Sequence, residues 1–445
     1  MKRALILAAL ALALLPGSAH AAGLQLGILD GRFSTADRAP WLQRAADSGA
    51  GIVRIDVGWP APSAPADPRD PADPAYDFSN ADASIKAASA DGLQVLASFT
   101  GAPAWAEGPN RDPDAEPGTW KPDPQAIEDY AYALGTRYSG SFPDPAAPGQ
   151  TLPKVQAFQV WNEPNLSKYL TPQWNGTQPA SPAQYRLMLN AFYRGIKATA
   201  PAALVVSAGT GPFGDLGPGG NRIMPARFVR ELLSAPVSFD VLAHHPYSVG
   251  APTRKALNAD DVSIPDIGKL TRILRAAEKA KRALPGIHHR VWVTEVSYDS
   301  SPPDPAGIPA ARHAGYLAQT FYLLARAGVD TIFWFQVGDQ APDPSFAATN
   351  QSGLYTLDGK AKPAQRAFRF PVYVHRTGRR TLSVWGRAPA TGRVRLERRA
   401  GNRWRRLRSV AVKAGQTFQV TVAASSAATV RARLGAVASI AWAVH

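Results

Sequence analysis

The chain has 445 residues and no cysteine, and its 49 Lys and Arg against 34 Asp and Glu give a formal net charge of +15. This length suits one large domain with a small one, or two to three average domains. Without cysteine there is no disulfide scaffold, no cysteine-ligated metal site and no thiol nucleophile. The positive charge suggests an anionic partner such as nucleic acid, a membrane or a wall polymer, so the placement of the basic residues matters.

The first residues have the pattern of a secretory signal peptide. Lys2 and Arg3 precede an apolar run from Ala4 to Leu15, which is too short to span a bilayer. Ala19-His20-Ala21 then matches the small-x-small cleavage pattern. We predict that residues 1–21 are removed and that the protein is secreted, as in an actinobacterial-type enzyme. The alternative is a buried first helix. No later segment is apolar enough to predict a membrane span.

Short apolar runs alternate with amphipathic segments over residues 22–370. The apolar, strand-like runs are 24–30, 52–59, 93–100, 155–162, 203–208, 239–247, 290–298 and 331–337. The amphipathic, helix-like segments are 38–48, 80–90, 124–138, 182–199, 225–233, 265–282 and 309–327. This alternation predicts a (β/α)8 TIM barrel. A doubly wound open sheet is the alternative, but no Gly-rich phosphate loop follows the first strand.

The longest connections follow the predicted strands, whereas most helix-to-strand connections are short. In a TIM barrel the active site lies where the strands end, so we expect the functional loops there. The Pro-rich stretch 139–154 is the exception, because it lies on the opposite face and has no functional interpretation.

Residues 371–445 differ from the rest in pattern and charge. Strand-like runs alternate with Gly, Ser and Ala turns and show no helical period, which predicts a small all-β, sandwich-like domain. This segment holds 15 basic residues and one acid, whereas residues 22–370 hold 32 basic and 33 acidic residues. The net charge therefore belongs to the tail. An anionic cell-wall polymer is the partner that this suggests; a soluble capping domain is the alternative, and nucleic acid is not expected for an exported chain.

One candidate catalytic carboxylate follows the fourth predicted strand. That strand runs into Trp161-Asn162-Glu163-Pro164-Asn165. A carboxylate at the carboxyl end of a barrel strand points into the mouth, and the proline ends the ladder. The alternative for an isolated Asn-Glu-Pro is a loop or helix-capping glutamate.

A second acid interrupts the apolar seventh strand. The run reads Val291-Trp292-Val293-Thr294-Glu295-Val296. Strict alternation would put Val291, Val293 and Glu295 on one face. A buried lone carboxylate is costly unless it is paired or functional, and a structural ion pair is the alternative. Strands four and seven lie on opposite sides of the barrel, so their ends can face each other across the mouth. Two carboxyls about 5–5.5 Å apart make a retaining glycosidase, and about 6.5–9.5 Å apart an inverting one.

These motifs resemble those of the retaining glycoside hydrolases of clan A. The segment from Trp161 to Asn165 is similar to the acid/base motif of family 39, and its Asn-Glu-Pro also resembles family 5. The resemblance covers roughly residues 24–370. It implies Glu163 as acid/base, Glu295 as nucleophile, and Asn162 as a donor to the substrate 2-hydroxyl.

Further positions follow from strand order within the same resemblance. An arginine in the second strand usually bonds the nucleophile, which implies that role for Arg54; a pair with Asp56 is the alternative. The sixth strand ends in His245-Pro246-Tyr247, similar to the clan's His-x-Tyr, whose tyrosine contacts the nucleophile. The preceding histidine is expected to pack locally. Two aromatic residues complete the expected set: Trp334 of the eighth strand as a sugar platform and Trp161 as a support.

The sequence thus predicts a secreted, monomeric retaining glycosidase that uses no metal or cofactor. Gly-x-Ser-x-Gly is absent, which argues against triad hydrolysis. The alternative function is a non-catalytic carbohydrate-binding or wall-associated barrel.

Overall fold

The computed structural model of the chain describes residues 23–424 and 427–444. The predicted signal peptide, 1–21, lies outside the described residues. None of the helices in the described part is long and apolar enough to cross a membrane.

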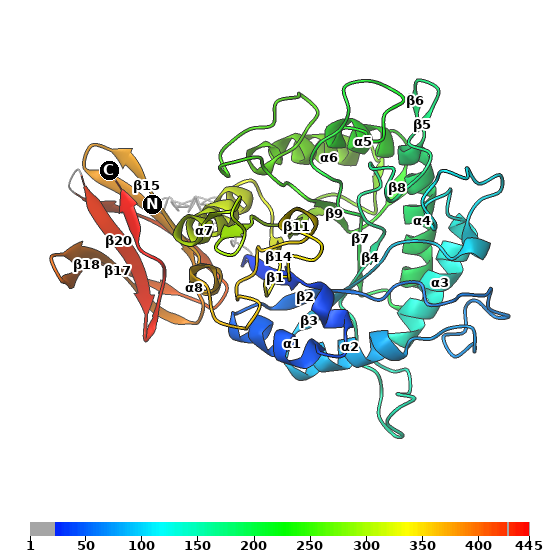
Figure 1. Cartoon of the computed structure of the whole chain (residues 1–445), viewed down its shortest axis with the longest axis horizontal. Helices are drawn as coiled ribbons and strands as arrows, with labels where there is room; N and C mark the ends of the chain where they lie inside the picture. The colour runs from blue at the N-terminus through cyan, green and yellow to red at the C-terminus, as the bar shows by residue number, and fades with distance from the viewer. Residues whose placement is uncertain (1–22, 425–426, 445) are drawn as a thin grey trace, which may run out of the picture.

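Eight parallel strands close into a barrel, which confirms the predicted fold class (Figure 1). In chain order these are β1 (Gln25–Leu29), β2 (Ile52–Asp56), β3 (Gln94–Phe99), β4 (Ala157–Val160), β7 (Leu204–Val206), β9 (Val241–His244), β11 (Arg290–Val296) and β14 (Thr331–Phe335). Each strand pairs with its neighbours in chain order, and β1 closes the barrel against β14.

Helices surround the barrel. They are α1 (Arg38–Asp47), α2 (Ser79–Ala90), α3 (Pro124–Arg137), α4 (Ser181–Thr199), α5 (Pro225–Leu232), α6 (Gly268–Lys279), α7 (Ala310–Arg326) and α8 (Pro363–Arg369). Proline in the first turn starts several of them, because its missing N–H would have no partner there. The seven predicted helices are present within a few residues at their ends, and α8 is an additional short helix.

The inside of the barrel is filled by side chains of alternate strand residues. They form a cluster separate from the main core: Ile52, Leu96, Ala157, Val206, Val241, Ala243, Trp292 and Phe333. On β1 the inward position is Gly27, where a Cβ would lie 2.6 Å from the Phe333 ring, so only glycine fits there. The residues between these pack outward against the helices, and this alternation fixes which side chains can reach the mouth.

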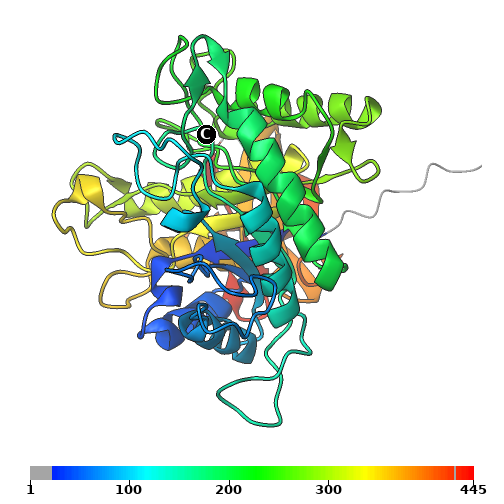
Figure 2. The same cartoon turned by 90° about the vertical axis from the view of Figure 1, so that its right-hand side faces the viewer.

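The connections carry three small two-stranded sheets. Two of them lie after barrel strands: β5 (Trp174–Asn175) with β6 (Gln178–Pro179), and β12 (Ser300–Ser301) with β13 (Ile308–Pro309). The third, β8 (Val237–Ser238) with β10 (Ala283–Leu284), lies before β9 and β11. The 139–154 connection projects at the lower edge of the molecule in two views (Figures 1 and 2).

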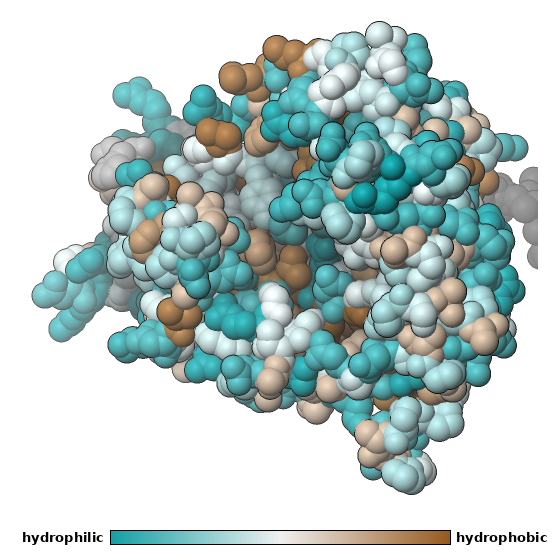
Figure 3. Space-filling model, turned by 45° about the vertical axis from the view of Figure 1, so that its right-hand side comes forward, coloured by the Kyte–Doolittle hydropathy of each residue, from teal (hydrophilic) through white to brown (hydrophobic). Residues whose placement is uncertain are grey.

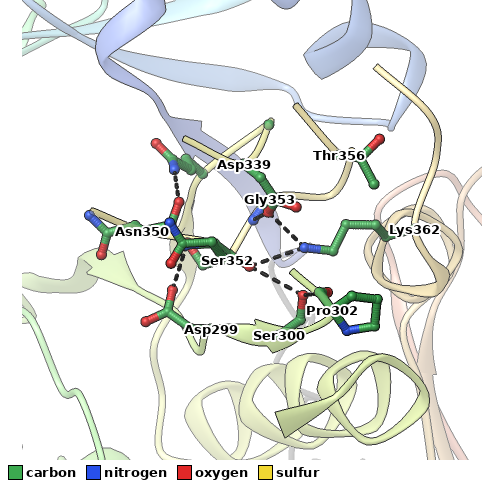
Figure 4. Close-up of polar contacts among 12 residues, drawn as sticks. Asp299, Ser300, Pro302, Asp339, Asn350, Ser352, Gly353, Thr356 and Lys362 are labelled. Atoms are coloured by element: carbon green, nitrogen blue, oxygen red, sulfur yellow. Dashed lines mark hydrogen bonds and ion pairs between the residues drawn. The ribbon is translucent and has the colours of Figure 1, made fainter. Parts of the chain in front are cut away.

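A buried ion pair holds the long connection between β14 and α8 (Figure 4). Lys362 Nζ lies 2.7 Å from Asp339 Oδ1 and donates to the Gln351 carbonyl at 3.0 Å. The Gly353 N–H donates to the same Asp339 oxygen at 2.9 Å. Ser300, from the connection after β11, donates to the Gln351 carbonyl at 3.3 Å. The cluster therefore ties together the connections that follow two neighbouring strands.

Two antiparallel sheets follow the barrel. One contains β15 (Val372–Gly378), β16 (Thr381–Arg387) and β19 (Thr417–Ala423). The other contains β17 (Gly392–Ala400), β18 (Arg403–Val412), β20 (Ala428–Leu434), β21 (Val437–Ala438) and β22 (Trp442–Val444). They enclose their own apolar core, and we call them together the β-module.

The β-module packs on helix α7 of the barrel (Figure 1). Tyr322 of α7 lies 4.7 Å from Tyr373 and 5.7 Å from Trp385, measured between ring centroids. Gln319 of the same helix donates a hydrogen bond to the Tyr373 hydroxyl at 2.9 Å. The contact between the two parts is thus aromatic and largely buried.

Candidate active site

A β-bulge turns Glu295 toward the mouth of the barrel. Trp292 and Thr294 of β11 face inward, so strict alternation would send Glu295 outward with Val293. The register between β11 and β14 shifts between Val293 and Val296, which inserts an extra residue. Bulges re-aim side chains in this way. The expectation that Val291, Val293 and Glu295 share one face is therefore wrong, and the bulge brings the carboxylate to its site.

One hydrogen bond and one ion pair hold the Glu295 carboxylate. The Tyr247 hydroxyl donates to Oε1 at 2.6 Å, and the Arg54 guanidinium lies 3.6 Å from Oε2. Burial, followed by the charge of Glu295, raises the pKa of Tyr247 well above its ordinary value, so the phenol remains a donor.

Arg54 links Glu295 to the loop that follows β4. Its Nη2 donates to Asn162 Oδ1 at 3.0 Å, and its Nε donates to Ser98 Oγ at 3.2 Å. The guanidinium is buried, so its position is fixed. The Asn162 side chain thus accepts from Arg54, and it also forms a side-chain hydrogen bond with Tyr169. The alternative pairing of Arg54 with Asp56 is not the contact seen.

Glu163 lies in a turn directly after β4. Its backbone φ is +35°, and its N–H donates to the Gly209 carbonyl at 3.0 Å. Glu163 Oε1 and His245 Nδ1 share a hydrogen bond of 2.9 Å. His245 Nε2 is in turn 3.0 Å from Thr294 Oγ1. This chain joins the carboxylate at β4 to the residue beside Glu295 on β11.

Gly209 leaves room for the His245 ring, and no sequence motif pointed to this glycine. A Cβ on Gly209 would lie 2.2 Å from the His245 ring. The ring is fully buried, so the packing around it restricts its movement. His244, on the opposite face, bonds to Thr210 and to the Val262 carbonyl, and burial lowers its pKa to about 3. It packs locally, as expected.

Tyr169 lies near enough to both carboxylates for their charges to affect its hydroxyl. Burial raises its pKa to about 12, and the charges of Glu163 and Glu295 add to the effect. Tyr247 is likewise influenced by both carboxylates. The bonds of Glu163 through His245 to Thr294, and of Glu295 to Tyr247 and Arg54, place both carboxylates at one mouth.

Both tryptophans expected at the site, Trp334 and Trp161, are fully buried. Trp334 packs between His313 and Phe321 of α7, and its Nε1 donates to the Ser352 carbonyl at 2.8 Å. It has no exposed face for a sugar, so the expected platform role is corrected to a core role. The inward aromatic residue at the end of β14 is Phe335, which is partly exposed.

Trp161 has a supporting position. It is fully buried, and its Nε1 donates to the Tyr169 carbonyl at 2.7 Å. The indole therefore fixes the loop that carries Tyr169 beside the two carboxylates.

Figure 3 shows a hollow near the middle of one face of the molecule, with apolar side chains inside and hydrophilic ones around it. A cavity of about 700 Å³ lies among the connections that follow β3, β4 and β7. Trp120, Lys168 and Trp174 line it, together with exposed acids. Because Lys168 follows Glu163 by only one short turn, this cavity borders the loop that carries Glu163.

Solved structures of similar fold cover most of the chain. A family 39 glycoside hydrolase from the gut symbiont Bacteroides cellulosilyticus is 18% identical, with 91% of this chain and 82% of that chain covered and a TM-score of 0.56. A glucosidase from Croceicoccus marinus is 15% identical, with 91% and 94% covered and a TM-score of 0.52. A family 39 β-xylosidase from Caulobacter crescentus is 15% identical, with 90% and 96% covered and a TM-score of 0.51.

At 15–18% sequence identity, the similarity to these structures shows a shared fold. The chain is structurally similar to glycoside hydrolases, family 39 among them. No protein-family model matches the sequence, and no curated protein matches it.

Proposed function

We propose that the protein is a retaining glycoside hydrolase acting on O-glycosidic bonds of a poly- or oligosaccharide. The observation that carries this is the pair of carboxylates from β4 and β11 in different surroundings at one mouth. Glu295 is held by a phenol and a guanidinium, whereas Glu163 is held by a histidine. Glu295 is thereby suited to attack the anomeric carbon, and Glu163 is suited to exchange protons.

In the first step, a Glu295 oxygen attacks the anomeric carbon while Glu163 gives its proton to the glycosidic oxygen. The bond from the anomeric carbon to that oxygen breaks, and the leaving sugar departs as an alcohol. A glycosyl ester on Glu295 remains, and Glu163 is now ionised.

In the second step, the ionised Glu163 takes a proton from water, and that water attacks the same carbon. The ester bond breaks and restores the Glu295 carboxylate. Two inversions give net retention of the anomeric configuration. His245 is a positioning residue here, because it touches Glu163 and not the reacting carbon. The amide group of Asn162 is the proposed donor to the sugar 2-hydroxyl.

The test follows the anomer that forms first. Aryl glycosides and polysaccharides are screened, and the hydrolysis of any responsive substrate is followed by NMR from the first turnovers. The β- or α-anomer of the product should match that of the substrate. Release of the opposite anomer would disprove the retaining mechanism, and ligand binding without turnover on any substrate would favour the alternative of a non-catalytic sugar-binding barrel.

We also propose that the chain is exported and works as a monomer, held near an anionic wall polymer by residues 371–445. The signal-peptide pattern in 1–21 and the charge of the tail support this. Amino-terminal sequencing of the secreted protein should begin at Ala22, and light scattering should give the mass of one chain.

A further inference from the structure

One face of the larger sheet in the β-module is dominated by arginine. Val394 and Leu396 of β17 point into the module core, so the alternate residues point outward. The outward arginines are Arg393, Arg395 and Arg399 of β17, Arg406 of β18, and Arg431 and Arg433 of β20. We call this set the arginine face.

Within the described residues, most of the charge on the arginine face has no acidic partner. Its single acid, Glu397, pairs with Arg431 at 2.9 Å. Arg395 and Arg433 are direct cross-strand neighbours, an arrangement of like charges that weakens a sheet. Among the described residues, no ion pair involves either of them. A bound anion would offset this repulsion.

A cavity of about 650 Å³ adjoins the arginine face where the β-module meets α1 and α8. Its charged lining residues are Arg369 of α8, Arg387 of β16, Arg393 and a single acid, Asp47. Arg393 belongs to both the cavity and the arginine face, so the two are continuous.

Arg387 is the innermost charge of this cavity. Its Nε donates to the Leu24 carbonyl, and no carboxylate pairs with it in the described part of the chain. Burial lowers the pKa of Arg387 to about 10, which reflects a cation without a counter-charge. An arginine fork is suited to carboxylate, sulfate and phosphate groups alike.

We propose that the cavity and the arginine face form one binding site for an acidic polysaccharide. The strand β17 spans nine residues, or about 30 Å, so the face suits an extended chain with several acidic groups better than one small anion. The choice of a polysaccharide over other polyanions rests on the proposed glycosidase function. The acidic group is a carboxylate, a sulfate or a phosphate.

The test measures binding of the full mature chain with Glu295→Gln, which keeps the polymer intact. Immobilised polygalacturonate, dextran sulfate and dextran phosphate distinguish the three acidic groups. Neutral dextran and a DNA duplex serve as comparisons. At least one acidic polysaccharide should bind more tightly than the DNA at equal salt, neutral dextran should not bind, and the affinity should fall as salt rises.

A charge-matched pair of variants locates the site. Arg393→Gln with Arg395→Gln should weaken binding about five- to twenty-fold, as expected for two exposed charge pairs. Arg379→Gln with Arg380→Gln removes the same charge from the turn between β15 and β16 of the other sheet and should change the affinity less than two-fold. None of the variants should lower the thermal midpoint of the parent.

Three outcomes would overturn the proposal: no binding to any acidic polysaccharide, tighter binding to DNA, or equal losses in the two double variants. A failure of this binding proposal can be distinguished from a failure of the proposed glycosidase function. With Glu295 intact, both double variants should hydrolyse a neutral aryl glycoside at the parental rate, and that rate tests the mouth of the barrel alone.

Discussion

The two carboxylates at the mouth are held by different side chains, and these decide what each can do. Glu295 accepts a hydrogen bond from Tyr247 and lies beside Arg54. Glu163 Oε1 forms a hydrogen bond with His245 Nδ1. The proposed division into nucleophile and acid/base follows from these neighbours, and it can be tested one side chain at a time.

Replacing Glu295 with Gln should abolish turnover while binding persists. The amide keeps the shape of the side chain but cannot form the glycosyl ester, so kcat should fall by about 10⁴-fold or more. Calorimetry with the unreacted ligand measures the binding that remains. Glu231→Gln, an exposed carboxyl on α5, is the matched control and should behave as the parent. Residual turnover near the parental rate would remove Glu295 from the mechanism.

Replacing Glu163 with Ala should slow hydrolysis of substrates with poor leaving groups by about 10²–10⁴-fold. An activated aryl glycoside needs no proton for its departure, so its glycosyl ester should still form. Azide fits the space left by the carboxylate and should restore the rate, giving a glycosyl azide that NMR detects. A complete lack of azide product would count against the acid/base role.

Replacing Tyr247 with Phe removes the 2.6 Å hydrogen bond to Glu295 but keeps the ring. A hydrogen bond to a charged group contributes about 1.5–3 kcal/mol, so kcat/KM should fall about 10- to 100-fold. The pH–rate profile should also shift, which loss of packing alone would not produce. Tyr193→Phe on α4 is the control. An unchanged profile and rate would show that the phenol is only structural.

Sequence patterns located both glutamates but not the full set of contacts around them. In Phe333-Trp334-Phe335, every residue is aromatic, so the letters alone do not reveal which side chains face inward. Only the register with β1 shows that Trp334 points to the helices. The bulge before Glu295 and the contact of His245 with Thr294 likewise depend on residues far apart in the chain.

At the scale of whole elements, most helices and all eight barrel strands followed from periodicity, because each buries one face. The helix α8 did not, since its seven residues are too few for a period to be recognised. It is positioned by the buried pair of Lys362 and Asp339 at its start, a contact between segments that the pattern does not reveal (Figure 4).

That buried pair predicts a large stability effect. Lys362→Met leaves Asp339 buried without its cation and should lower the free energy of unfolding by about 3–5 kcal/mol, measured in urea. Lys360→Met removes a lysine from an exposed pair with Asp358 and should leave the free energy of unfolding nearly unchanged. Adding Asp339→Asn to Lys362→Met should recover part of the loss, because the amide still accepts from the Gly353 N–H. Equal effects of the two lysine variants would contradict this account.

At the scale of the whole molecule, the neutral barrel and the basic β-module are joined by apolar contacts. Tyr322 of α7 packs against Tyr373 and Trp385 of the module. The Trp442 indole donates to the Val372 carbonyl beside this contact. Interfaces of this aromatic kind favour a fixed arrangement over independent motion. The sequence predicted the two parts but not this contact, because α7 reads as an ordinary barrel helix.

The contact predicts that barrel and β-module unfold together. Calorimetry of the mature chain should show one transition, because unfolding the module would expose the aromatic face of α7 to water. Tyr322→Ala removes the central ring and should cost about 3–5 kcal/mol, either lowering that transition or splitting it into two. Leu187→Ala, exposed on α4, is the control and should leave the trace unchanged. Two separate transitions in the parent protein would mean that the parts are energetically independent, and Tyr322 would then contribute little to either.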